Sequence, residues 1–108
     1  MNFFLANSIT IANNVSVGVS FYQNIDFYAT ADITILYSTN LNIYSAFFII
    51  TIIEKKKKYR FSYGRKWNNE KIRNSRIKLP IDKTGNPDWQ FMENYIKSLP
   101  YGKGLVSR

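Results

Sequence analysis

The sequence contains neither cysteine nor histidine. Disulfide bonds are therefore excluded, as are metal sites built on thiolate or imidazole ligands. Catalysis through an imidazole base or a thiol nucleophile is excluded as well, and no glycine-rich phosphate-binding loop is present. Few groups suited to catalysis are therefore present, and we expect no metal site and no cofactor.

Signals for membrane insertion and export are also missing. The longest mainly apolar stretch, Ile43–Ile53, is about half of the ~20 residues that span a bilayer. The opening segment, Met1–Ser8, has no basic residue and so does not predict a signal peptide. The absence of cysteine is compatible with a reducing compartment. The expectation is a cytoplasmic protein without membrane contact.

Positive charge is missing from the first half of the chain. Residues 1–54 contain no lysine or arginine and carry three acids, Asp26, Asp32 and Glu54. Residues 55–108 hold all fifteen cations against four acids, so that half has a net charge of +11 and the whole chain +8. This asymmetry predicts one cationic surface and a polyanion as its partner.

The length and composition indicate one small folded domain. The chain has 108 residues, of which 45% are hydrophobic, which suits a globule with a modest core. We expect residues 1–108 to form a single domain, with residues 100–108 as a loose tail. The predicted fold class is α/β in the broad sense (α+β), with a mostly antiparallel twisted sheet, a buried central helix and a C-terminal helix.

Alternating residues predict the sheet. Ser8–Ala12 and Val15–Tyr22 alternate on either side of Asn13-Asn14, which predicts a β-hairpin. A third strand is expected over Ala31–Tyr37. On the second strand we expect the valines and Phe21 to share the side of Ile9 and Ile11. The opposite, polar side then carries Ser16, Gly18, Ser20 and Tyr22.

The rest of the chain predicts two longer helices joined by irregular segments. Asn42 to about Lys58 is too long for a strand, and Asn40 or Asn42 is a plausible N-cap. That helix is apolar nearly all round, which indicates burial on several sides. Asp88 is expected to cap a second helix that ends near Leu99 and includes a Glu93–Lys97 pair. Between the helices we expect a loop over Tyr59–Asn69, a short helix over Asn69–Arg73, an edge strand over Arg76–Ile81 and a turn over Asp82–Asp88.

The segment Lys55–Lys78, called here the cationic segment, carries the clearest functional signal. It holds eleven cations and one acid, with Tyr59, Phe61, Tyr63 and Trp67 among them. Lysine and arginine neutralise phosphates, arginine also reads guanine edges, and aromatic faces stack on bases. The plainer alternative is a solvated helix end followed by core aromatics. The expected DNA contacts are Arg65, Lys66, Tyr63 and Trp67 around Gly64, with Lys55, Lys56, Lys57, Lys58, Arg73 and Arg76 on phosphates and Ser16, Ser20 and Tyr22 at base edges.

Two blocks of sequence resemble a known family. Asn7–Gly18 with Phe21-Tyr22, and Tyr59–Lys66 followed by Ile77–Pro80 and Gly85–Ile96, are similar to target-recognition domains. These domains belong to DNA-specificity (S) subunits of type I and BcgI-like restriction–modification enzymes. The similarity covers roughly residues 7–99. Its most specific part is Ile77–Ile81 together with Gly85–Ile96, which resembles the end of such a domain in the BcgI-like branch.

The resemblance implies a non-catalytic domain that binds double-stranded DNA and reads part of a bipartite target. The implied protein partners are a methyltransferase subunit, a nuclease or translocase subunit, and a second specificity half or a second copy. A usual recognition domain is longer at its N-terminus and is followed by a long spacer helix, so this chain resembles a truncated or split form. Two other functions stay open. One is an interaction remnant that binds a methyltransferase or a partner copy with little DNA affinity, and the other is a small RNA-binding protein.

Overall fold

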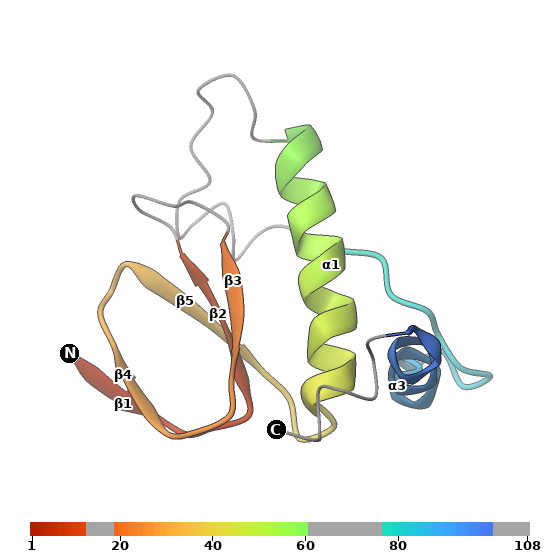
Figure 1. Ribbon diagram of the computed structural model, residues 1–108, viewed down its shortest axis with the longest axis horizontal. Helices are drawn as coiled ribbons and strands as arrows, with labels where there is room; N and C mark the ends of the chain where they lie inside the picture. Colours follow the sequence, from red (N-terminus) through yellow and green to blue (C-terminus); the bar gives the residue numbers. More distant parts are fainter. Residues whose placement is uncertain (13–18, 61–76, 101–108) are drawn as a thin grey trace.

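The fold combines two small antiparallel sheets with two helices (Figure 1). A computed structural model describes residues 1–12, 19–60 and 77–100, with side chains up to residue 55 in the second range. One sheet pairs β1 (Asn2–Phe4) with β4 (Phe27–Ala29), and the other has the order β3-β2-β5. The helices are α1 (Ile43–Arg60) and α3 (Trp89–Ser98). The predicted α+β class is therefore confirmed.

The three-stranded sheet contains the predicted hairpin. β2 (Ser8–Ala12) pairs antiparallel with β3 (Ser20–Gln23) on one side and with β5 (Ile33–Tyr37) on the other. The amide of Ala12 also donates to the carbonyl oxygen of Val19 at 3.0 Å. The predicted turn at Asn13-Asn14 lies outside the described residues.

The predicted orientation of the second hairpin strand is wrong. Tyr22 lies opposite Ile9 and Ser20 opposite Ile11, and directly paired residues point to the same face of a sheet. Ser20 is 8% exposed, whereas Phe21 is 61% exposed. Ser20 and Tyr22 therefore lie on the side of the core, and Phe21 faces away from it.

A second, two-stranded sheet was not predicted. β1 pairs with β4 through Phe3 opposite Tyr28 and Phe4 opposite Phe27. The rings of Phe3 and Tyr28 meet edge to face, with centroids 5.3 Å apart, and those of Phe4 and Phe27 stack at 5.6 Å. Aromatic cross-strand pairs of this kind stabilise short strands.

Helix α1 confirms the predicted central helix, which lies between the three-stranded sheet and α3 (Figure 1). Asn42 is its N-cap, since its side-chain oxygen accepts from the amides of Tyr44 and Ser45, each at 3.0 Å. Ala46, Ile49 and Ile53 are buried in the core that α1 forms with the sheet and α3. The β-branched residues are tolerated because burial outweighs their small helix penalty.

The segment before α3 departs from the prediction in one respect. Ile77–Pro80 has no regular secondary structure, and Ile81 makes only an isolated bridge with Pro87. The predicted strand over Arg76–Ile81 is therefore wrong over the described residues 77–81. Pro80 has no amide hydrogen to donate to a ladder, and the apolar alternation arises because Ile77 and Leu79 pack against the core.

The turn and the second helix follow the prediction. Gly85 adopts a positive φ of 85°, and the Asp82 amide donates to the Asn86 carbonyl at 2.8 Å. The Asp88 carboxylate then accepts from the Phe91 amide at 3.0 Å and caps α3. Helix α1 continues to Arg60, so the loop expected from Tyr59 starts at least two residues later. The helix expected over Asn69–Arg73 and the tail at 101–108 lie outside the described residues.

Candidate nucleic-acid interface

Over the side chains described up to residue 55, the core contacts of α1 end just before its cations begin. Ile53 is 3% exposed, Glu54 is partly buried and Lys55 is exposed. Lys56, Lys57 and Lys58 occupy the next positions, and Arg60 ends the helix. Four consecutive positions go fully round a helix of 3.6 residues per turn. The last turns of α1 therefore carry a run of basic positions that follows the described core residues.

The positive charge at the end of α1 lies outside the sequence region that forms the sheets. Both sheets lie within residues 1–54, which contain no lysine or arginine. Figure 1 shows the C-terminal end of α1 at the same end of the molecule as the tips of β2 and β3 that border the hairpin turn. Lys97 lies elsewhere, on α3, and forms an ion pair with Glu93. The fold thus separates a cation-free sheet layer from a cationic helix end.

The direction of α1 favours cations at this end. Aligned peptide dipoles leave partial negative charge at a helix C-terminus, so cations there contribute roughly 0.3–1 kcal/mol each at best. With 18 residues, α1 is about 27 Å long at 1.5 Å per residue. Core residues Ala46, Ile49 and Ile53 anchor the first three turns of this helix, and its basic end continues from them.

Only part of the predicted contact set falls on described residues. The structure gives the positions of Lys55, Lys56, Lys57 and Lys58 in one helical run. Six candidates in residues 61–76 and one in residues 13–18 lie outside the described residues, so the structure does not place them against that run. These seven are Ser16, Tyr63, Arg65, Lys66, Trp67, Arg73 and Arg76.

Two predicted base-edge residues, Ser20 and Tyr22, lie on the side of β3 that faces the core. The Tyr22 hydroxyl donates to Asn7 Oδ1 at 2.7 Å, and Asn7 Nδ2 donates to the Leu41 carbonyl oxygen at 2.7 Å. Asn7 has a positive φ of 66°, a conformation that asparagine tolerates better than most residues. Burial raises the pKa of the Tyr22 phenol. These contacts tie β3 to the start of α1 and give both residues a role in the fold, while their contact with base edges stays a prediction.

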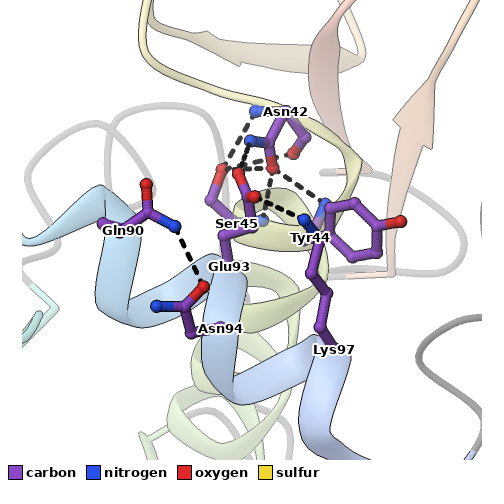
Figure 2. Close-up of polar contacts among 7 residues, drawn as sticks. All are labelled: Asn42, Tyr44, Ser45, Gln90, Glu93, Asn94 and Lys97. Atoms are coloured by element: carbon purple, nitrogen blue, oxygen red, sulfur yellow. Dashed lines mark hydrogen bonds and ion pairs between the residues drawn. The ribbon is translucent and has the colours of Figure 1, made fainter.

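A polar cluster that the sequence did not indicate fixes α3 on α1 (Figure 2). Asn42 Nδ2, from the cap of α1, donates to Glu93 Oε1, and Lys97 Nζ donates to Glu93 Oε2 at 2.7 Å. Lys97 also lies 4.8 Å from the centre of the Tyr44 ring. The hydrogen bonds that Glu93 accepts from Lys97 and, to a smaller extent, from Asn42 lower the pKa of the Glu93 carboxyl. The hydrogen bond to Glu93 raises the pKa of Lys97. Only the Glu93–Lys97 pair was predicted.

The described residues contain neither a cluster of acids for a metal ion nor a membrane-spanning helix. In residues 1–12, 19–60 and 77–100, no three acidic side chains lie close enough together to hold a metal ion. Within that same part of the chain, neither helix has the length and apolar character needed to cross a membrane.

Comparison with known proteins identifies the class of domain. Residues 1–103 match the family described as type I restriction modification DNA specificity domain. The match covers nearly the whole chain, and the chain belongs to this family. The resemblance found in the two sequence blocks is thereby confirmed. No curated protein and no solved structure gives a significant match.

Proposed function

We propose that this chain is a target-recognition module that binds double-stranded DNA through the C-terminal end of α1 and the cationic segment that follows. The family is that of a DNA specificity domain in type I restriction–modification. The observation that carries the proposal is that Ile53 of α1 is buried in the core and that, after Glu54, four consecutive lysines continue the same helix.

The roles within this surface follow from chemistry. Lys55–Lys58 would contact phosphates, because lysine is a flexible point charge without a preferred base edge. Arg65 would read a base, because a guanidinium can donate two hydrogen bonds to guanine. Tyr63, Lys66, Trp67, Arg73 and Arg76 complete the proposed surface. The domain would have no catalytic role and would direct a methyltransferase subunit, and with it a nuclease or translocase subunit, to the target. Its site of action would be the cytoplasm.

Substitutions that separate phosphate contact from base reading test these roles. Lys56→Ala should weaken binding to all duplexes by a similar factor, whereas Arg65→Ala should reduce the preference between target and non-target duplexes. Lys83→Ala is the matched control, because Lys83 is an exposed cation in the turn before α3. Fluorescence anisotropy with labelled duplexes measures all three. Equal losses for Lys56→Ala and Lys83→Ala would mean that net charge alone drives binding.

The same titrations decide between duplex and single-stranded targets. A target-recognition module should bind duplex DNA more tightly than a single strand of the same sequence. Tighter binding to single-stranded RNA would instead support the RNA-binding alternative, in which the aromatic residues stack on unpaired bases.

A further inference from the structure

A second surface, on the opposite side of α1 from the sheet, has no part in the proposed DNA contacts apart from one residue. An open groove of about 460 Å³ runs between α1 and α3. Phe91 and Tyr95 of α3 are 49% and 50% exposed on its wall, although both are large apolar residues. We call it the aromatic groove, and its apolar lining consists of Phe47, Phe48, Ile52, Phe91, Tyr95 and Leu99.

The two flanks of α3 face different parts of α1, and one of them lines the groove. One flank carries Glu93 and Lys97, which face the N-terminal end of α1 through Asn42 and Tyr44. The other flank carries Phe91 and Tyr95, whose rings meet Phe48 edge to face at 6.3 and 5.7 Å. This second flank faces the middle of α1, from Phe47 to Lys55. The groove therefore lies along α1, between α3 and the cationic helix end.

The charges around the groove select its occupant. Among the described residues that line it, Lys55 is the one with a charge and none carries a carboxylate. The outer face of α3 beside it is polar but neutral, since the Gln90 side-chain amide donates to Asn94 Oδ1 at 2.9 Å. DNA offers no apolar side chains to such a surface. A second copy that docked the same groove face to face would bring a second Lys55 and no carboxylate.

From this geometry we infer that the aromatic groove binds an amphipathic helix of another protein, with an aliphatic stripe against the aromatic rings and a carboxylate against Lys55. A helix in this position would pack on α1 beside α3, as helices pack in grooves of this kind. It would bury the exposed halves of Phe91 and Tyr95, which act as the aromatic anchors typical of protein interfaces. The inference goes beyond DNA binding and does not depend on it.

Designed helical peptides test this inference on the full chain. The probe is an 18-residue peptide with leucines at the i, i+3, i+4, i+7 spacing and glutamates on both flanks. One control peptide has lysine in place of each glutamate. The other has the acidic composition in a scrambled order, which keeps the charge but removes the stripe. We expect saturable binding of the first peptide, measured by fluorescence anisotropy, and at least tenfold weaker binding of both controls.

Two substitutions locate the binding. Phe91→Ser removes a half-exposed ring, and Thr51→Arg places a bulky cation at an exposed groove position. Each should weaken binding of the acidic peptide at least tenfold, and Phe91→Ser should leave duplex DNA affinity within a factor of two. Thr30→Arg, at an exposed position outside the groove, is the matched control for the charge that Thr51→Arg adds. Circular dichroism checks that each variant is folded, and Thr51→Arg serves if Phe91→Ser is not.

Other outcomes overturn the inference. The groove is not a helix site if the scrambled acidic peptide binds as well as the patterned one, if neither binds, or if both groove variants bind normally. Self-association that Phe91→Ser abolishes, seen by analytical ultracentrifugation, would assign the groove to a second copy instead. Because DNA binding is measured on the same variants, failure here is distinguishable from failure of the proposed function.

Discussion

Replacing Ile49 with alanine tests whether burial of α1 holds the domain together. Ile49 is 2% exposed and belongs to the core that α1 forms with the three-stranded sheet and α3. The substitution removes three carbon atoms, each worth about 0.8 kcal/mol of transfer free energy, and leaves a cavity between packed layers. We therefore expect the free energy of unfolding to fall by about 3–4 kcal/mol. That is a large share of the roughly 5–15 kcal/mol that stabilises a typical domain.

Urea denaturation followed by far-ultraviolet circular dichroism measures this loss. Thr51→Ala is the control, because Thr51 lies two positions along the same helix but is exposed, and its hydroxyl only donates to the Phe47 carbonyl at 2.9 Å. Its effect should stay within about 0.5 kcal/mol, as for most surface substitutions. If Ile49→Ala cost no more than Thr51→Ala, α1 would not be the buried element described above, and a fixed cationic end would lose its support.

Three further predictions concern local structure. Asn42→Ala should lower the free energy of unfolding by about 1 kcal/mol, because it removes the side-chain cap of α1; an unchanged urea midpoint would contradict the cap. Gly85→Ala should lower the free energy of unfolding by about 1–2 kcal/mol in the same assay, because φ at Gly85 is 85° and alanine is strained there. No atom lies within 4 Å of an added Cβ, so backbone strain is the only cost. Gly85→Asn should cost less, and equal costs for the two variants would argue against strain. The lowered pKa of Glu93 stabilises the fold at a pH above the ordinary carboxyl pKa of 4.5, and this contribution should disappear as the pH falls through the lower pKa of the folded state. Glu93→Gln should therefore lose less free energy of unfolding between pH 5 and pH 3 than the unmodified chain. Parallel curves of stability against pH for the two proteins would refute the link.

Local signals in the sequence were sufficient for both helices. Asn42 and Asp88 each precede an apolar stretch of helical length and each accepts hydrogen bonds from the first turn. Capping of this kind depends on residues three or four apart, which are visible in one sequence. The turn at Gly85 was predictable for the same reason.

Features that depend on distant residues were not predictable. Both faces of β3 carry aromatic or apolar residues, so alternation alone could not decide whether Phe21 or Tyr22 is buried. Pairing with Ile9 decides it in favour of Tyr22. The β1–β4 sheet joins segments more than twenty residues apart, and the Asn42–Glu93 hydrogen bond joins the two helices. No local pattern encodes such partners.

The candidate site was predictable in its charge but not in its shape. The run Lys55–Lys58 and the absence of cations before it are plain in the sequence, and the helix places that run after the buried Ile53. The aromatic groove is different, because helical spacing puts Phe91, Met92, Tyr95 and Ile96 on one apolar stripe and does not say which of them are buried. Only the packing of α3 on α1 shows that Met92 and Ile96 fill the core and leave those two rings half exposed.

The salt dependence of duplex binding tests the central claim most directly. If the cationic end of α1 and the segment after it neutralise about six phosphates, log K against log salt should have a slope near −5. Changing Lys55–Lys58 to glutamine together should make that slope shallower by about 3–4, since four phosphate contacts are lost. A slope near zero in the unmodified chain, or one that the fourfold substitution leaves unchanged, would contradict the claim that this helix end binds DNA.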